Sequence, residues 1–216
     1  MNIIPAIIPD SLAHLQESLA RVGFTKRVQI DVVDGEFVNH ISWPYEPAGN
    51  IADVADLISE HDVEVDLMVN DSVRAAGFWL EAGAKALVFH IEGVPNMDDV
   101  FALREKKPFQ LGISLNNDTP LEVIHSYLDK VDFVQVMGIV EIGSQGQPFD
   151  SRALERVAML RSLYPGLILS VDGAVSEENI LELKNAGADH FVVGSSILNA
   201  NNPEQKYQEL LRIVQG

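Results

Sequence analysis

The sequence predicts an α/β fold, a single (β/α)8 TIM barrel that takes in residues 1–216 as one domain. Short apolar runs rich in β-branched residues alternate with segments of helical period along the whole chain. No linker, low-complexity tract or break in composition divides them. Each of the eight repeats has about 27 residues, which is close to the smallest strand-loop-helix-loop unit that closes a parallel barrel.

The predicted strands are the apolar runs. In chain order they cover residues 3–8, 28–33, 63–69, 86–91, 109–115, 133–140, 167–171 and 190–193. The clearest helical periods, with apolar residues three and four apart, cover residues 11–22, 121–130, 152–163, 177–185 and 204–214. Gly83 and Gly187, each between two alanines, are typical helix stops before the next strand. An open doubly wound sheet is the competing fold, but eight regular units without a Gly-x-Gly-x-x-Gly turn favour the barrel.

The charge of the chain restricts its partners. The formal net charge is −17, and the 15 Lys and Arg residues are scattered, so neither nucleic acid nor an anionic membrane surface is an expected partner. No cysteine is present, which excludes disulfides and thiolate metal sites. No apolar run approaches the roughly 20 residues that span a bilayer, and we expect a cytoplasmic protein.

Two aspartates stand at the carboxyl ends of apolar strands, each close to a glycine turn. Asp31 lies in the segment from Val28 to Gly35, and Asp172 lies in the segment from Leu167 to Gly173. A buried carboxylate is costly unless it is paired, hydrogen-bonded or bound to a metal, so the two predict a shared polar pocket. In a parallel barrel the ends of all strands meet at one mouth. The side chains expected there are Asp31, Asp66, His90, Asn116, Met137, Asp172 and Gly194.

Three glycine-bearing turns follow the last three predicted strands and suggest an anion site. The last strand runs into Gly194, Ser195 and Ser196 and then a short apolar segment, which can present backbone N–H groups at the start of a helical turn. Gly173 follows Asp172, and the loop from Gly143 to Gln147 follows the sixth strand. The loops after strands seven and eight are the usual phosphate site of this architecture, so a phosphorylated ligand is expected.

The motifs at these strand ends resemble the ribulose-phosphate 3-epimerase family, in the right order and over nearly the whole chain. They are Ile4-Pro5-Ala6-Ile7-Ile8, Gln29-Ile30-Asp31-Val32-Val33-Asp34-Gly35, Asp66-Leu67-Met68-Val69, Phe89-His90-Ile91-Glu92, Val136-Met137, Gly146-Gln147, Val171-Asp172-Gly173 and Val193-Gly194-Ser195. The resemblance implies an isomerase that inverts C3 of a ketose phosphate, D-ribulose 5-phosphate to D-xylulose 5-phosphate or a close analogue. It also implies a homo-oligomer.

In that family two aspartates work on opposite faces of the sugar, and a metal ion stabilises the ene-diolate between the two proton transfers. The resemblance assigns the proton transfers to Asp31 and Asp172. For His90, a hydrogen bond to a neighbouring backbone group is an equal alternative to a substrate contact. Candidate contacts to substrate and phosphate are His90, Met137, Gly143, Gly146, Gly173, Gly194 and Ser195.

The chain departs from the family's pattern at the metal site. The two histidines that join the aspartates around the metal correspond to Gln29 and Asp66, so the expected ligands are Gln29, Asp31, Asp66 and Asp172. This oxygen-only set favours magnesium or manganese over zinc or iron as the divalent cofactor. Ala6 also replaces a serine, and Val33 replaces a methionine.

Two other functions stay open. The segment Asp66-Leu67-Met68-Val69-Asn70-Asp71 is similar to the Asp-x-Lys-x-x-Asp motif of the orotidine-monophosphate decarboxylase group, with Met68 in place of the lysine. That resemblance implies a phosphosugar lyase. The missing histidines and Ala6 instead suggest a phosphosugar-binding protein without catalysis, although the presence of both Asp31 and Asp172 argues against it.

Overall fold

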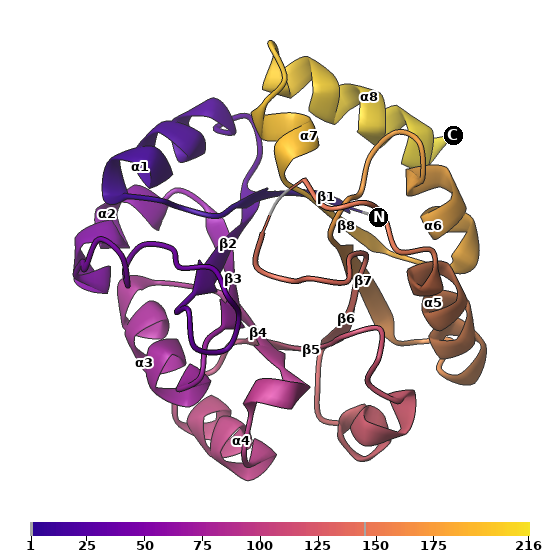
Figure 1. Cartoon of the computed structure of the whole chain (residues 1–216), viewed down its shortest axis with the longest axis horizontal. Coiled ribbons are helices and arrows are strands. Elements are labelled where there is room, and N and C mark those ends of the chain that lie inside the picture. Colours follow the sequence, from indigo (N-terminus) through magenta and orange to yellow (C-terminus); the bar gives the residue numbers. More distant parts are fainter. Residues whose placement is uncertain (1, 145) are drawn as a thin grey trace.

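The computed structural model describes residues 2–144 and 146–216, so Gln145 of the predicted glycine loop lies outside the described residues. Eight parallel strands form a closed barrel in the order β1-β2-β3-β4-β5-β6-β7-β8, which confirms the predicted TIM barrel. Figure 1 shows the strands as an inner ring with the helices around them. The strands are β1 (Asn2–Ile7), β2 (Arg27–Val33), β3 (Asp62–Met68), β4 (Ala86–His90), β5 (Gln110–Leu115), β6 (Phe133–Met137), β7 (Ile168–Asp172) and β8 (His190–Val193).

The helical segments lie between consecutive strands and after the last one. They are α1 (Leu12–Arg21), η1 (Ile51–Val54), α2 (Ala55–Ile58), α3 (Ser72–Ala82), η2 (Ile91–Gly93), α4 (Met97–Lys106), η3 (Leu121–Tyr127), α5 (Arg152–Leu163), α6 (Ile180–Ala186), α7 (Ser195–Leu198) and α8 (Pro203–Gln215). Gly83 and Gly187 end α3 and α6 in the left-handed conformation, as predicted.

One predicted helical stretch is a 3-10 helix. The sequence predicts a helical segment over residues 121–130, and the structure has the 3-10 helix η3 there. Its buried side chains, Leu121 and Ile124, are three residues apart. Because a 3-10 helix has three residues per turn, this spacing places both on one face, and the apolar pattern alone does not separate the two helix types.

The main hydrophobic core lies outside the barrel wall, between the strands and the helices. Ile30 and Val32 of β2 belong to it, and so do Leu15, Trp79 and Leu160 of the helices. The barrel interior has a second and much smaller apolar cluster of Ile4, Ala6 and Val192. The interior next to that cluster is polar. Alternate residues of a strand point to opposite faces of the sheet, so the polar residues of a strand can face the interior while the apolar ones face the helices.

The long loop after β2 packs against the barrel. Trp43 is buried, lies edge to face against Trp79 of α3, and donates its backbone N–H to the carbonyl of Pro9. This loop therefore joins the segments that follow β1 and β2 near the mouth of the barrel.

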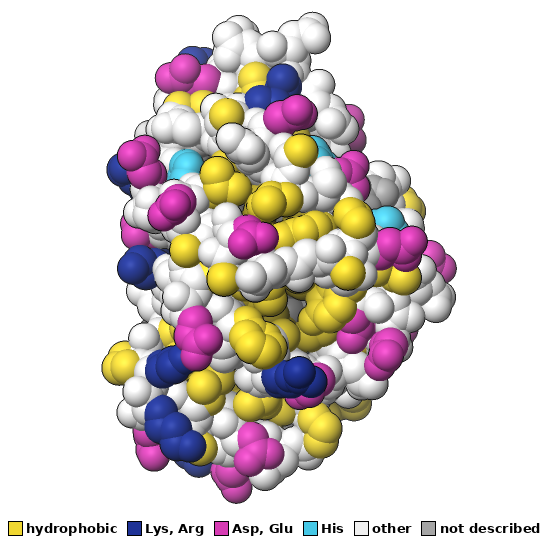
Figure 2. Space-filling view, turned by 90° about the vertical axis from the view of Figure 1, so that its left-hand side faces the viewer, with side chains coloured by type: hydrophobic (Ala, Val, Ile, Leu, Met, Phe, Trp, Pro, Cys, Tyr) yellow, Lys and Arg dark blue, Asp and Glu magenta, His cyan; other side chains and the backbone are white. Residues whose placement is uncertain are grey.

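The surface carries mixed charges. On the face shown in Figure 2, acidic and basic side chains are interspersed with exposed hydrophobic and uncharged ones. None of the helices in the described ranges combines the length and the apolar character that crossing a membrane requires.

Candidate active site

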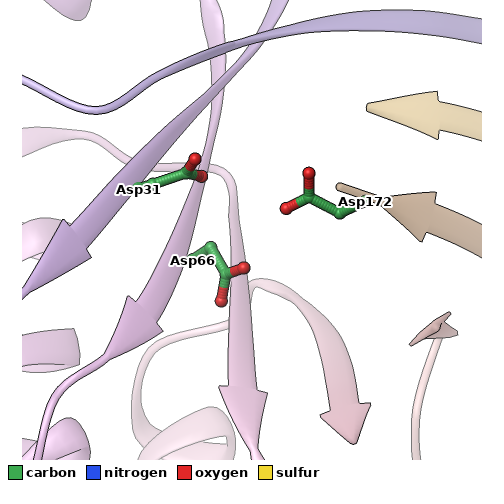
Figure 3. A group of neighbouring side chains, drawn as sticks. All are labelled: Asp31, Asp66 and Asp172. Atoms are coloured by element: carbon green, nitrogen blue, oxygen red, sulfur yellow. The ribbon is translucent and has the colours of Figure 1, made fainter. Parts of the chain in front are cut away.

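Three aspartates point toward one another inside the barrel, near the carboxyl ends of β2, β3 and β7 (Figure 3). Asp31 and Asp66 are partners in the register of β2 and β3, and Asp172 is the last residue of β7. One carboxylate oxygen from each lies within 4.8 Å of the others. All three are buried, since Asp31 is 5% exposed, Asp66 0% and Asp172 8%.

A cavity opens directly above two of these aspartates. Asp31 and Asp172 line it, whereas Asp66 is fully buried and does not. The predicted residues Met137, Gly143, Gly146, Gly173, Gly194 and Ser195 line the same cavity. It is completed by Ala6, Ile8, Met68, Ile139, Ser144, Gln147, Ala174, Val175 and Val192. The structure therefore joins the two aspartates and the three glycine turns into one site, open to a ligand.

The turns reach the cavity because they adopt conformations that suit glycine. Gly143, Gly146 and Gly173 have φ values of +85°, +78° and +107°, which glycine adopts without the strain that a Cβ brings. Gly138 brings the ends of β6 and β7 together, and its N–H donates to the carbonyl of Asp172 at 2.6 Å. A Cβ on Gly138 would lie 2.1 Å from the carbonyl oxygen of Gly173, so only glycine fits there.

Hydrogen bonds divide the carboxylate oxygens into two groups. Oδ1 of Asp31 and Oδ2 of Asp172 both accept from Nε2 of Gln29, at 2.7 and 2.8 Å. Asp66 uses both oxygens, one with Nε2 of His90 at 3.0 Å and one with Nε2 of Gln135 at 2.8 Å. Within residues 2–144 and 146–216 no donor reaches Oδ2 of Asp31 or Oδ1 of Asp172, so each of these aspartates keeps one oxygen for chemistry.

Burial and mutual repulsion change the acidity of the two cavity aspartates. Desolvation is the largest cause that raises the pKa of Asp31 well above its usual value, and the charges of Asp172 and Asp66 add to it. Desolvation, followed by the charge of Asp66, raises the pKa of Asp172 to about 7. A carboxyl group with such a pKa exchanges its proton readily at neutral pH, which general acid and base catalysis requires.

His90 lies behind Asp66 and does not line the cavity. It is 1% exposed, and its ring bonds the carboxylate of Asp66 and lies against the ring of Phe37. Burial lowers the pKa of His90, but the charge and hydrogen bond of Asp66 raise it by more, so the net pKa lies above the usual value. In the described chain the ring of His90 bonds Asp66 and no backbone group, and its contact with substrate stays a prediction.

The carboxylates fit a hard divalent cation, since three negative oxygens close together are the donor set that magnesium, manganese and calcium prefer. The family resemblance and the Asp31, Asp66 and Asp172 cluster are thus compatible with a metal site. Gln29 fits less well as a ligand, because its nitrogen faces Asp31 and Asp172 while its Oε1 is buried away from any donor in the described chain.

Sequence reasoning missed Gln135 and Glu64, which also point into the barrel. Both are fully buried, and Gln135 bonds Asp66 while Glu64 pairs with Arg27 at 2.8 Å. Each precedes a mouth residue by two positions, Met137 in one case and Asp66 in the other, and therefore faces the same interior. A polar residue two positions before a site residue in an apolar strand is the signal that identifies them.

Comparison with known proteins agrees with this geometry. A model of the ribulose-phosphate 3 epimerase family matches residues 2–198. Ribulose-phosphate 3-epimerase of Schizosaccharomyces pombe is 29% identical over 212 residues, which cover 94% of this chain and 90% of the relative. The protein of the same name from Aquifex aeolicus is 32% identical over 188 residues, with 85% and 82% covered.

Solved structures show the same fold at low identity. 3-Hexulose-6-phosphate synthase from Salmonella typhimurium superposes with a TM-score of 0.73 at 14% identity, over 100% of this chain and 99% of its own. KGPDC from Streptococcus mutans in complex with D-R5P gives 0.73 at 16% identity, over 99% and 97%. These structural similarities show only that the fold is the same. The family model and the sequence relatives show more, namely that the chain belongs to the ribulose-phosphate 3-epimerase family.

Proposed function

We propose that this protein inverts the configuration at C3 of a ketose phosphate, converting D-ribulose 5-phosphate to D-xylulose 5-phosphate. The observation that carries the proposal is the pair Asp31 and Asp172, which face one cavity from different strands and each keep one carboxylate oxygen free. Family membership supports the substrate class, and the fold neighbour KGPDC from Streptococcus mutans, solved in complex with D-R5P, supports a sugar phosphate as the kind of ligand.

The reaction needs two acid-base groups on opposite sides of the sugar. One aspartate takes the proton from C3, and the electron pair of that bond moves toward the C2 carbonyl, so negative charge develops on the carbonyl oxygen. The other aspartate, protonated beforehand, donates its proton to C3 from the opposite face, which inverts the centre. One of the two must start ionised and the other protonated. In the metal-free chain, burial and the neighbouring carboxylates raise the pKa of both Asp31 and Asp172, which favours one proton shared by the pair.

Asp31, Asp66 and Asp172 would hold the divalent cation, with magnesium or manganese favoured over zinc or iron by the oxygen donors. Such a cation supplies electrophilic stabilisation of the negative oxygen. The chain's own residues bind and orient the substrate: backbone groups of the turns at Gly143, Gly173 and Gly194 surround the end of the cavity proposed for the phosphate.

The lyase alternative lacks its proton donor in this cavity. Met68 lines the wall at the position where the decarboxylase motif has lysine, and a thioether carries no transferable proton. The two acid-base groups of the epimerase proposal, Asp31 and Asp172, in contrast both line the cavity.

The test is deuterium exchange at C3, followed by NMR in heavy water with magnesium or manganese supplied. We expect the wild type to form xylulose 5-phosphate that carries deuterium at C3. Asp31→Asn and Asp172→Asn should each lower interconversion by about 10²-fold to 10⁴-fold. Each variant should still exchange the C3 proton of one epimer, and the two variants should exchange different epimers, because each keeps one of the two bases.

Asp71→Asn is the matched control. Asp71 is an exposed carboxylate before α3 and makes no side-chain cap bond, so this variant should keep the wild-type rate. Failure of the wild type to exchange the proton with either metal, or full interconversion in both single variants, would show that the two-base proposal is wrong.

A further inference from the structure

Two glutamine side chains connect the three carboxylates into a continuous chain of hydrogen bonds. Nε2 of Gln29 lies 2.7 Å from Oδ1 of Asp31 and 2.8 Å from Oδ2 of Asp172. Nε2 of Gln135 lies 2.8 Å from Oδ2 of Asp66 and 3.4 Å from the same Oδ2 of Asp172. Both glutamines are 0% exposed. Every aspartate of the cluster thus accepts an N–H bond from at least one amide.

The charge of the aspartates explains which way the amides face. An amide group has two N–H donors and one carbonyl acceptor, and a carbonyl oxygen turned toward a carboxylate would be repelled. Oε1 of Gln29 and Oε1 of Gln135 instead lie buried with no partner in the described chain, which costs free energy because a buried acceptor loses its hydrogen bonds to water. Hydrogen bonds to ionised oxygens are about twice as strong as neutral ones and offset this cost.

We propose that Gln29 and Gln135 form an amide clamp, which holds the three carboxylates together in the metal-free protein and competes with a divalent cation for their oxygens. The clamp lowers cation affinity and preserves the geometry of the site when no cation is bound. The inference concerns the cation of the proposed active site and so rests on the proposed function, but its test does not depend on turnover.

The change in cation affinity on removal of the Gln29 amide distinguishes the clamp from the ligand role expected for Gln29, because the two roles predict changes in opposite directions. If Gln29 bound the cation through Oε1, removal of its amide would weaken binding. If it acts as a clamp, removal frees the oxygens of Asp31 and Asp172 and strengthens binding. Gln135 provides an independent check at Asp66, because no ligand role was predicted for it.

The experiment measures Mn²⁺ binding to the full chain after removal of metal, by electron paramagnetic resonance of free Mn²⁺. Gln29→Met and Gln135→Met remove the N–H donors and keep a side chain of similar length. We expect each to bind Mn²⁺ at least about tenfold more tightly than wild type, because each variant loses hydrogen bonds to two carboxylates and a single charge-assisted hydrogen bond is already worth about that factor. The metal-free variants should also melt at lower temperature than wild type, and Mn²⁺ should raise their melting temperature by more.

Ser114→Ala is the control, since Ser114 is buried in the same interior but its hydroxyl bonds the sulfur of Met137 and no carboxylate. It should leave Mn²⁺ affinity unchanged. Weaker binding by Gln29→Met, unchanged binding by both methionine variants, or no Mn²⁺ binding by any protein would overturn the clamp.

A measurement on the wild type applies even if a variant does not fold. The side-chain NH₂ signals of Gln29 and Gln135 should exchange slowly with solvent in the metal-free protein and move when Mg²⁺ is added to saturation. Signals that stay in place would overturn the clamp. If the wild type is an epimerase but the variants do not bind Mn²⁺ more tightly, the clamp is wrong and the proposed function stands. If the variants bind Mn²⁺ more tightly but the wild type has no epimerase activity, the clamp stands and the proposed function is wrong.

Discussion

His190 shows how a single buried residue makes folding depend on pH. It lies at the amino end of β8, is 9% exposed, and its Nε2 contacts the side-chain amide of Asn2 at 3.2 Å. Burial, followed by the charge of Arg27, lowers the pKa of His190 to about 4. In the folded protein this imidazole therefore stays neutral at pH values where it becomes protonated in the unfolded chain.

We predict that this difference destabilises the fold in mild acid. The lowered pKa means that stability is complete above the unfolded value of about 6.5 and is lost as the pH falls from there toward 4, by about 3 kcal/mol at full extent. The measurement is the free energy of unfolding in urea at pH 7 and pH 4.5 for wild type and His190→Gln. The variant should lose less stability than wild type over this interval; equal losses would show that His190 does not titrate as described.

At the scale of elements, the contact between the ends of β6 and β7 fixes the position of Asp172. Gly138 follows β6, bonds the carbonyl of Asp172 and leaves no room for a Cβ against Gly173. The strand prediction extended to residue 140, but β6 ends at Met137 because the chain turns at this glycine. A change there moves a proposed catalytic strand end without touching the cavity side chains.

Gly138→Ala should therefore lower both stability and activity. The inserted methyl group forces the two strand ends apart, and overpacking of this kind costs about 1–3 kcal/mol. Gly77→Ala in α3 is the matched control, because a Cβ at Gly77 meets nothing within 4 Å, and alanine should stabilise the helix by about 0.5–1 kcal/mol. The measurements are the free energy of unfolding in urea and the turnover rate of both variants. If Gly138→Ala were as stable as wild type, the tight contact at Gly138 would be contradicted.

The sequence predicted most strands and helices and part of the candidate site, but not all of its residues. The strands and most helices followed from apolar period, and Asp31 and Asp172 followed from their place after apolar runs. Gln135 and Glu64 were missed because the expected site residues were sought only at the strand ends, although each is a polar residue two positions before such an end residue and so faces the same interior. The bond between His90 and Asp66 joins residues of two strands, and its geometry depends on side-chain conformations that no local pattern specifies.

At the scale of the whole molecule, the net charge of −17 opposes the compact state. The surface ion pairs, such as Arg152 with Asp118 and Lys107 with Glu81, offset little of this repulsion because exposed pairs contribute about 0–1 kcal/mol. Dissolved salt screens charges beyond about 10 Å at 0.1 M, so it relieves the long-range repulsion more than it weakens the short pairs.

We therefore expect the melting temperature to rise as sodium chloride increases from 10 mM to 500 mM. For a chain of this size each kcal/mol of stabilisation corresponds to roughly 2–4 °C. Thermal unfolding followed by circular dichroism is the measurement, with sucrose as an uncharged control for general cosolute effects. A melting temperature that falls with salt would mean that the ion pairs, rather than the net charge, dominate the electrostatic free energy.

The separation of the large apolar core outside the barrel wall from the polar interior has an evolutionary consequence. Along β2, Ile30 and Val32 pack against helices, whereas the intervening Gln29 and Asp31 face the interior. Inward-facing residues can therefore be substituted during evolution, which changes the reaction, while the outward-facing residues continue to direct folding. A family built this way can give rise to new chemistries by point substitution at inward-facing positions such as those of Gln29 and Asp66.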